Sequence, residues 1–187
     1  DFTRDITTAN LTTASITLSA TARVYQTTLA NQLVVTDGTN TPFVWDGTVN
    51  GGLTKLTNAP VAYGPPTVYY AKLFFLKNTA RDSIVWSEEG TPNTGYEVGF
   101  SNVWQLRQSG AGPLNRILGR NEALYYWRKQ SIGSIRGAVA ADFTTAGVHD
   151  DVSRQVGTTA PESVLDYEGA IWFVDDIGRP WRFFPGG

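Results

Sequence analysis

The single histidine of the chain stands beside two carboxylates, in the order His149, Asp150, Asp151. Imidazole and carboxylate groups together form a ligand set that transition metals accept. Neighbouring side chains of a strand point to opposite faces, so only His149 and Asp151 would share a face. The chain has no cysteine and no second histidine, so a zinc site of usual composition cannot be assembled from it alone. We therefore expect a solvated loop or a subunit contact here, with no bound metal and no cofactor.

Paired carboxylates are the second candidate for chemistry, because glycoside hydrolysis uses two carboxyl groups that flank the scissile bond. Neighbours in sequence are poorly placed for that geometry. A glycosidase would need distant carboxylates, such as Glu88 and Asp142, to converge within roughly 5–10 Å. The adjacent acidic pairs are Glu88–Glu89, Asp150–Asp151 and Asp175–Asp176.

Several of the acidic residues are better explained by turns. Asp37–Gly38 and Asp46–Gly47 are turn signals, and Asp175–Asp176 falls in a predicted hairpin turn. The sequence contains no nucleophile elbow, phosphate-binding glycine loop, dinucleotide-binding fingerprint or calcium loop. We expect no enzyme and assign no catalytic, cofactor-binding or metal-binding residues.

A basic segment spans residues 101–136, with six basic residues against one acidic one, although the whole chain has a formal net charge of −2. Arginines interleaved with aromatic residues can hold phosphates and stack on bases, which makes nucleic-acid binding one alternative. The aromatic run Tyr125–Trp127 has the pattern of a buried strand, so we favour an acidic partner surface, such as a neighbouring copy. The basic residues are Arg107, Arg116, Arg120, Arg128, Lys129 and Arg136.

Five tryptophans could form stacking platforms for sugars, because an aromatic face presents an apolar plate to a pyranose. They recur at equivalent positions of a repeated pattern, which favours packing between sheets over carbohydrate binding. These residues are Trp45, Trp86, Trp127, Trp172 and Trp181.

The elements that must position these residues are predicted to be strands. The chain has 187 residues, 41% of them hydrophobic, which suits one domain with a real core. Short bursts of β-branched and aromatic residues alternate with Gly, Pro, Asn and Asp, and no apolar run is long enough for a membrane helix. Residues 1–22 are rich in threonine and predict an extended arm or edge strand, and residues 23–187 predict the main domain. Because the chain lacks methionine and opens on Asp1, we expect it to be part of a longer polypeptide.

A hairpin unit recurs four times, with Leu33, Leu73, Leu124 and Ile171 at equivalent positions and intervals of 40, 51 and 47 residues. In each unit an apolar burst precedes a polar turn and a second burst. The first bursts are apolar at consecutive positions, so both faces of these strands should be covered. A β-propeller repeats a hairpin at such intervals and is our favoured fold, with a β-sandwich as the alternative. Gly64–Pro66 and Gly110–Pro113 are the expected blade boundaries, and Pro180 predicts that the last strand lies at an edge.

The order of phrases resembles a family of β-propeller-like structural proteins from the tail nozzle or tail tip of tailed bacteriophages. The resemblance covers about four fifths of the chain and rests on four short phrases: "LVVTDGTNTPFVWDG", "YAKLFFLKNTARDSIVWSEEGTPNTGYE", "LGRNEALYYWRKQSIGSIRG" and "APESVLDYEGAIWFVDDIGRPWRF".

This resemblance implies a virion protein that assembles in the host cytoplasm and acts through subunit interfaces, without catalysis. The implied partners are portal and other tail proteins, further copies in a cyclic homo-oligomer such as a hexamer, and DNA as a non-specific neighbour. A carbohydrate-binding or receptor-binding propeller of a tail tip, or a surface lectin, is the alternative.

Overall fold

A computed structural model describes most of the chain as β-structure. The described residues are 15–18, 21–48, 52–56, 58–87, 102–106, 112–120, 123–136 and 148–185. They form fifteen strands and one short 3-10 helix, η1 (Pro161–Ser163). None of their helices is long and apolar enough to cross a membrane. The all-β prediction is confirmed.

The strands form four antiparallel sheets, each built from consecutive strands of the chain. The first sheet contains β1 (Tyr25–Leu29), β2 (Gln32–Thr36), β3 (Phe43–Trp45) and β4 (Leu53–Lys55). The second contains β5 (Ala62–Tyr69), β6 (Lys72–Lys77), β7 (Ser83–Trp86) and β8 (Asn102–Gln105). The third contains β9 (Leu114–Arg120), β10 (Ala123–Arg128), β11 (Ile132–Arg136) and β12 (Val148–Ser153). The fourth contains β13 (Leu165–Tyr167), β14 (Ala170–Val174) and β15 (Pro180–Phe183).

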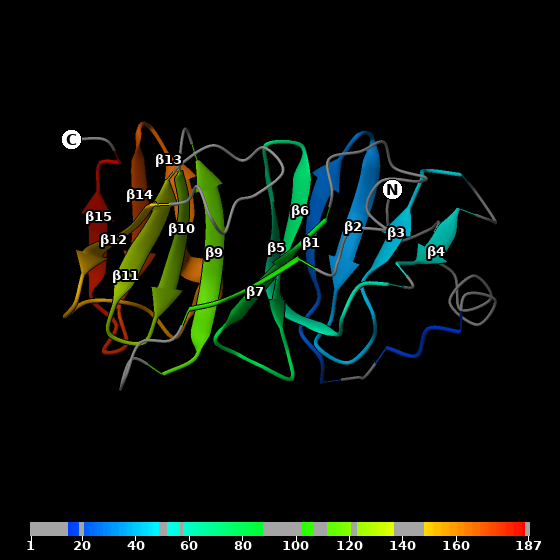
Figure 1. The fold of residues 1–187 in the computed structure, drawn as a ribbon, viewed down its shortest axis with the longest axis horizontal. Helices are drawn as coiled ribbons and strands as arrows, with labels where there is room; N and C mark the ends of the chain where they lie inside the picture. Colours follow the sequence, from blue (N-terminus) through cyan, green and yellow to red (C-terminus); the bar gives the residue numbers. More distant parts are fainter. Residues whose placement is uncertain are drawn as a thin grey trace.

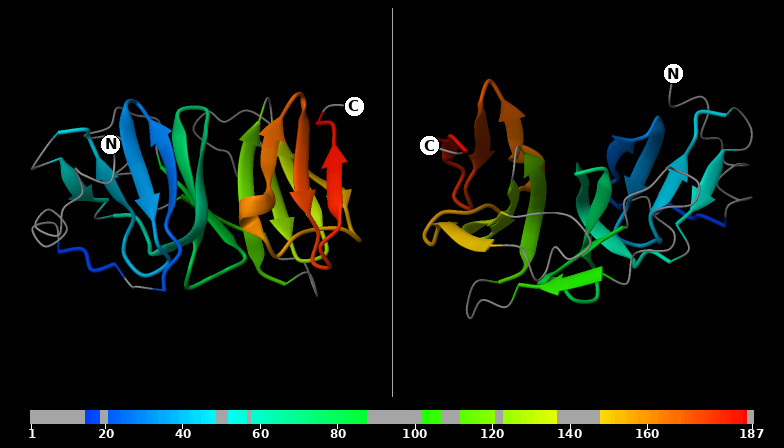
Figure 2. Two further views of the ribbon diagram at one scale, coloured as in Figure 1. Left: turned by 180° about the vertical axis from the view of Figure 1, so that it is seen from behind. Right: turned by 45° about the horizontal axis from the view of Figure 1, so that its top comes forward.

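The four sheets follow one another along the long axis of the molecule (Figure 1). A tilted view shows them arranged in an arc, with the first sheet at one end and the fourth at the other (Figure 2). The first strands of neighbouring sheets meet, since β5 contacts both β1 and β9. Chain order and spatial order are therefore the same.

The first hairpin of three sheets turns through two residues in the left-handed region. These pairs are Ala30–Asn31, Tyr70–Ala71 and Glu168–Gly169, all with positive φ. Two consecutive positive φ angles are typical of a type I′ turn, whose twist matches that of the flanking strands. The turns align β1 on β2 and β13 on β14 without an offset, and they pair Tyr69 with Lys72 at the start of the β5–β6 hairpin.

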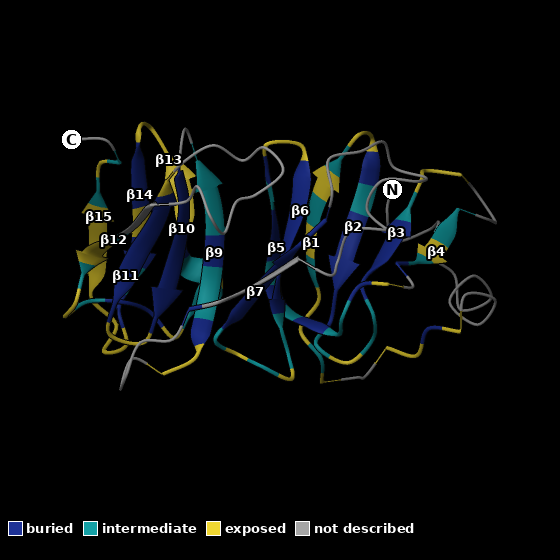
Figure 3. Cartoon of the chain, viewed as in Figure 1, coloured by how far each residue is buried: buried dark blue, intermediate teal, exposed yellow. Residues whose placement is uncertain are grey.

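Apolar clusters between the sheets form the core. Because successive side chains of a strand alternate between faces, the second strands of the first three sheets contribute to clusters on both of their sides. The first and second sheets share Val34, Val44, Leu73, Phe75 and Val85. The second and third share Phe74, Leu76, Trp86, Ile117, Leu124 and Tyr126, among others. The third and fourth share Tyr125, Trp127, Ile132, Ile171 and Phe173. Figure 3 shows buried strands in the middle of the arc and more exposed ones toward its ends.

The predicted repeat matches the observed register. Leu33, Leu73, Leu124 and Ile171 are each the second residue of the second strand in their sheet. All residues of β10 and all but the last of β6 are buried, which confirms that both faces of these strands are covered.

One predicted boundary is wrong. Gly64–Pro66 lies inside β5, where the register to β6 shifts between Tyr63 and Thr67. Prolines lack an amide donor, and a bulge is one of the few places in a sheet that tolerates them. Of the other expected boundary, Gly112 and Pro113 immediately precede the third sheet, as predicted, and residues 110–111 lie outside the described residues. Pro180 begins β15, an edge strand, as predicted.

The N-terminal prediction falls partly outside the described residues, which begin at residue 15 and omit residues 19–20. Ile16 is buried against Val35 and Phe43 on the outer face of the first sheet. The side-chain amide of Asn40 donates to the Thr17 carbonyl, and Lys55 donates to the Ser15 carbonyl. This segment therefore covers part of the outer face. The extended arm over residues 1–22 stays a prediction.

Candidate functional site

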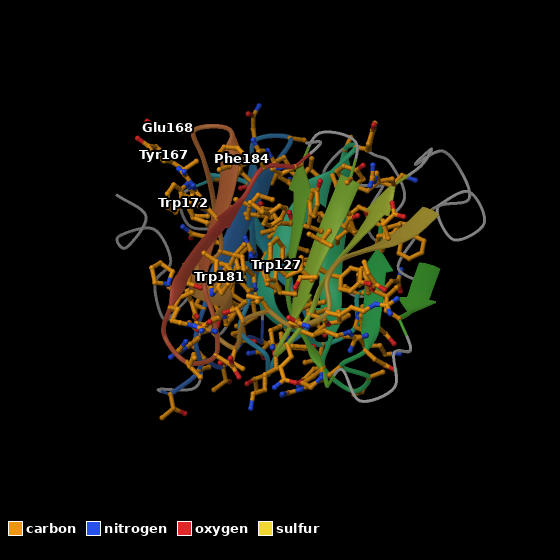
Figure 4. All side chains as sticks on the ribbon, turned by 90° about the vertical axis from the view of Figure 1, so that its left-hand side faces the viewer. Trp127, Tyr167, Glu168, Trp172, Trp181 and Phe184 are labelled. Atoms are coloured by element: carbon orange, nitrogen blue, oxygen red, sulfur yellow. The ribbon has the colours of Figure 1, made fainter. Side chains whose placement is uncertain are left out.

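The outer face of the fourth sheet exposes large apolar side chains, and we name it the terminal face. It comprises Leu165, Tyr167, Trp172, Arg182 and Phe184. Leu165, Trp172 and Arg182 lie side by side across three strands, because Leu165 pairs with Trp172 and Trp172 pairs with Arg182. Figure 4 looks onto this end of the molecule and shows Tyr167 and Trp172 toward the same end of the sheet.

Arg182 organises the terminal face. Its guanidinium carbon lies 5.3 Å from the ring centroid of Trp172 and 5.4 Å from that of Phe184. A cation held over aromatic rings at such distances is attracted by their negative faces, with about 0.5–1 kcal/mol at an exposed site. The contact holds two large aromatic side chains in place at the surface.

The exposure of Trp172 is unusual for its place in the repeat. The third residue of each second strand points toward the next sheet, and Val34, Phe74 and Tyr125 hold this place in the first three sheets. Their exposed fractions are 0%, 0% and 7%, whereas that of Trp172 is 37%. No further sheet follows the fourth among the described residues, so its forward-pointing side chains face solvent.

At the opposite end of the arc, the outer face of the first sheet contains a surface hollow of about 620 Å³. Leu33 and Trp45, which pair across β2 and β3, form its apolar part and are half-buried. Thr28, Ala30, Asn31, Gln32 and Gly47 complete the lining. The chain therefore has a hollowed face at one end and a face with projecting aromatic groups at the other.

Asp175 organises the hairpin turn between β14 and β15. One carboxylate oxygen accepts hydrogen bonds from the backbone N–H groups of Ile177 and Arg179. The other accepts hydrogen bonds from Nε of Arg179 and Nε1 of Trp181. Burial raises the pKa of the Asp175 carboxyl, but these hydrogen bonds outweigh burial and hold the pKa well below its usual value. The prediction that this acidic pair serves a turn is confirmed.

Two other aspartates also order turns. Asp37 accepts the backbone N–H groups of Thr39 and Asn40 and the side-chain amide of Asn40. The Asp46 carboxylate accepts the backbone N–H of Thr48, and this bond lowers its pKa. The Asp37–Gly38 and Asp46–Gly47 signals were correctly interpreted as turns.

The five tryptophans whose side chains are described divide into three groups by exposure. Trp86 and Trp127 are buried between sheets, with exposed fractions of 4% and 0%, as predicted. Trp45 is half-buried. For Trp172 and Trp181 the prediction of packing between sheets is wrong, because both are more than a third exposed. Trp172 lies on the face of β14 that no further sheet covers among the described residues. Trp181 pairs with Phe173 on the opposite face, where its Nε1 donates to Asp175.

The basic segment is tied into the fold. Arg128 is 1% exposed and donates to the carbonyls of Leu106 and Gly112. Arg116 donates to the Pro65 carbonyl, and burial lowers its pKa to about 10. The other described basic residues form ion pairs: Arg120 with Asp166, Lys129 with Asp176, and Arg136 with Asp150. Arg107 lies outside the described residues.

These contacts bear on two expectations. Tyr125, Tyr126 and Trp127 are buried, which confirms that the aromatic run belongs to the core. Their rings are therefore not accessible for stacking on bases. The acidic partners of the described basic residues come from this chain itself, and the contact with a neighbouring copy stays a prediction.

The remaining candidates for chemistry are not brought together among the described residues. Asp150 and Asp151 form ion pairs with Arg136 and Arg154, and no group of three metal-binding side chains occurs in the described part of the chain. His149 pairs with Ile135 in the sheet, but its side chain lies outside the description. Glu88, Glu89 and Asp142 also lie outside it.

The terminal face was missed as a unit in the sequence. Arg182 and Tyr167 each occur within a short aromatic or acidic run that reads as an ordinary strand end. The available signal was the position of the fourth unit, because no further unit follows it among the described residues to cover its forward-pointing side chains. That signal predicts an exposed Trp172 but does not identify the other residues of the terminal face.

No protein-family model matches the chain, and no curated protein matches it. Among solved structures, it is similar to the crystal structure of the computationally designed Ika4 protein, with 10% sequence identity and a TM-score of 0.56. The match covers 91% of this chain and 96% of that chain. At this identity the similarity concerns the fold alone.

Proposed function

We propose that the four sheets are blades of a β-propeller and that the chain is a structural, non-catalytic assembly module. The consecutive sheets, their strand order and the contacts between first strands support the propeller. The terminal face is the observation that carries the assembly role, because an exposed cluster of Trp, Tyr, Phe and Leu around an arginine is typical of a protein interface.

The location we propose is the tail of a tailed bacteriophage, in the nozzle or tail-tip assembly below the portal. The support for it is the order of sequence phrases across the four hairpin units. In such an assembly the chain works through its shape and its interfaces. The buried arginine and the turn aspartates stiffen the blades, since their polar groups are used in internal hydrogen bonds.

Immunogold electron microscopy tests this location. Antibodies raised against the recombinant chain are applied to purified virions of the phage that carries its gene, and mass spectrometry measures the chain in the same particles. We expect the chain in stoichiometric amounts and the label at the junction between capsid and tail or along the tail. Virions that lack the chain, or label confined to the capsid, would refute the proposal.

Carbohydrate binding is the second candidate, favoured by the exposed Trp172 ring with Arg182 beside it. Because Arg182 already lies over one face of that ring, we rank this function lower. A glycan array probed with the wild-type chain and with Trp172→Ala separates the two. Glycan binding that disappears in the variant would support a lectin, and no binding by the wild type would remove this candidate.

A further inference from the structure

We infer that a second copy of this chain packs the outer face of its first sheet onto the terminal face, so that the series of sheets continues from copy to copy. The inference rests on the proposed assembly role and names its partner and its surfaces. Phe74, Tyr125 and Trp172 are each the third residue of the second strand in their sheet. Phe74 and Tyr125 are covered by the following sheet, and Trp172 occupies the same place with no following sheet among the described residues.

The outer face of the first sheet also leaves a repeat residue partly uncovered. The second residue of each second strand points toward the preceding sheet, and Leu73, Leu124 and Ile171 are each 0% exposed there. Leu33 holds this place in the first sheet, which no sheet precedes among the described residues. It packs against the cluster of Ile16, Val35 and Phe43 and is half-buried. Among the described residues, the outer face of the first sheet therefore lacks a preceding sheet, and the outer face of the fourth sheet lacks a following one.

The shapes of the two ends are complementary. The first sheet offers the hollow of about 620 Å³ beside Leu33 and Trp45. The terminal face offers Trp172 and Phe184 as projecting aromatic groups. Aromatic side chains that enter a pocket of the partner contribute much of the binding energy at protein interfaces.

The two end faces also carry opposite charges. Arg182 brings a positive charge to the terminal face, where it lies over both aromatic rings. Asp46 is exposed in the loop that follows β3, next to Gly47 at the lining of the hollow. Opposite charges across an interface favour the correct partner and orientation.

The proposed contact joins two different faces, so it is heterologous. Such contacts produce a closed ring when the rotation between copies closes and an open filament when it does not. Each copy in a ring uses both ends. A heterologous contact should therefore be weakened by a substitution on the first sheet, whereas a symmetric contact of the fourth sheet with itself should not.

The test uses sedimentation velocity and light scattering of the 187-residue chain over a wide concentration range. Trp172→Glu places a charge on the terminal face, and Thr28→Glu places one at the exposed rim of the hollow. Ile177→Glu is the matched control, because Ile177 is 68% exposed in the turn of the same fourth sheet. Circular dichroism and thermal melting verify that each variant is folded.

We expect the wild type and Ile177→Glu to associate alike. Each of the other two variants alone should associate at least about thirtyfold more weakly, as for the loss of one hot spot. An equimolar mixture of Trp172→Glu and Thr28→Glu should form a one-to-one complex. In that pair, the unaltered terminal face of one chain meets the unaltered first sheet of the other.

Three results would overturn the inference: a wild type that stays monomeric at every concentration, a Thr28→Glu variant that associates like the wild type, and a mixture that remains monomeric. A monomeric chain that is nevertheless present in virion tails would refute this interface and leave the proposed function intact. A chain that forms the expected ring but is absent from virions would refute the proposed location alone.

Discussion

Two aromatic residues at the same place of the repeat should differ greatly in what they contribute to stability. Phe74 and Trp172 are each the third residue of a second strand, but a following sheet covers only Phe74. We therefore compare Phe74→Ala with Trp172→Ala. The first removes a side chain from between two sheets, and the second removes one from the terminal face.

The structure sets the expected magnitudes. Phe74 is 0% exposed and stacks on Trp86 at a centroid distance of 5.9 Å, so its removal leaves a cavity and should lower the unfolding free energy by about 4 kcal/mol. Trp172 is 37% exposed, and solvent fills the space it leaves. Its loss removes partial burial and the contact with Arg182, which we expect to cost about 1.5 kcal/mol.

Urea unfolding followed by tryptophan fluorescence and circular dichroism measures both variants. The comparison is made at the lowest practical concentration, where association contributes least to stability. As the concentration rises, the deficit of Trp172→Ala should grow if the terminal face is an interface, whereas that of Phe74→Ala should change less. Equal losses in dilute protein would contradict the argument that only one of the two positions is covered.

Three further predictions concern the interior and the last turn. Gly157→Ala should destabilise the chain by about 2 kcal/mol or more in urea unfolding, because an added Cβ would lie 2.1 Å from the carbonyl oxygen of Arg128; an unchanged midpoint would refute this packing. Arg128→Met keeps much of the side-chain volume but leaves two carbonyls without their donor, and should cost about 2–3 kcal/mol, with Arg128→Lys closer to wild type. The folded-state pKa of Asp175 is lowered, so its contribution is present above the unfolded pKa of about 3.9 and is lost as pH falls below it. The stability gap between wild type and Asp175→Asn should therefore narrow in acid, and the same wide gap at low and neutral pH, or an equal gap for Asp176→Asn, would contradict this assignment.

The second and third strands of each sheet could be predicted from the sequence. Consecutive apolar residues such as those of β6 and β10 need cover on both faces, and the polar turn that follows each burst fixes the hairpin. The Asp175 turn was predictable for a similar reason, since aspartate accepts backbone N–H groups two to four residues ahead.

The first strands were harder to predict because their turns carry weak signals. Tyr70–Ala71 adopts positive φ at both residues, although neither residue type favours it. The pairing of β5 with β6 therefore imposes this turn, against local preference. For the same reason Gly64–Pro66 was taken for a boundary, when tertiary context places it at a bulge inside a strand.

The exposure of side chains at the ends of the arc could not be derived from the repeat itself. The proposed binding surfaces lie at these ends. A repeat gives equivalent residues the same direction, but burial also requires a neighbouring sheet on the correct side. Trp172 and Leu33 point in the direction that the repeat gives, but no sheet lies on that side among the described residues. The described basic residues of the segment 101–136 and the turn aspartates already have partners within the chain, so we place the binding surfaces on the two end faces. An assembly that joins these ends extends to a second molecule the contact that already holds the second sheet to the third.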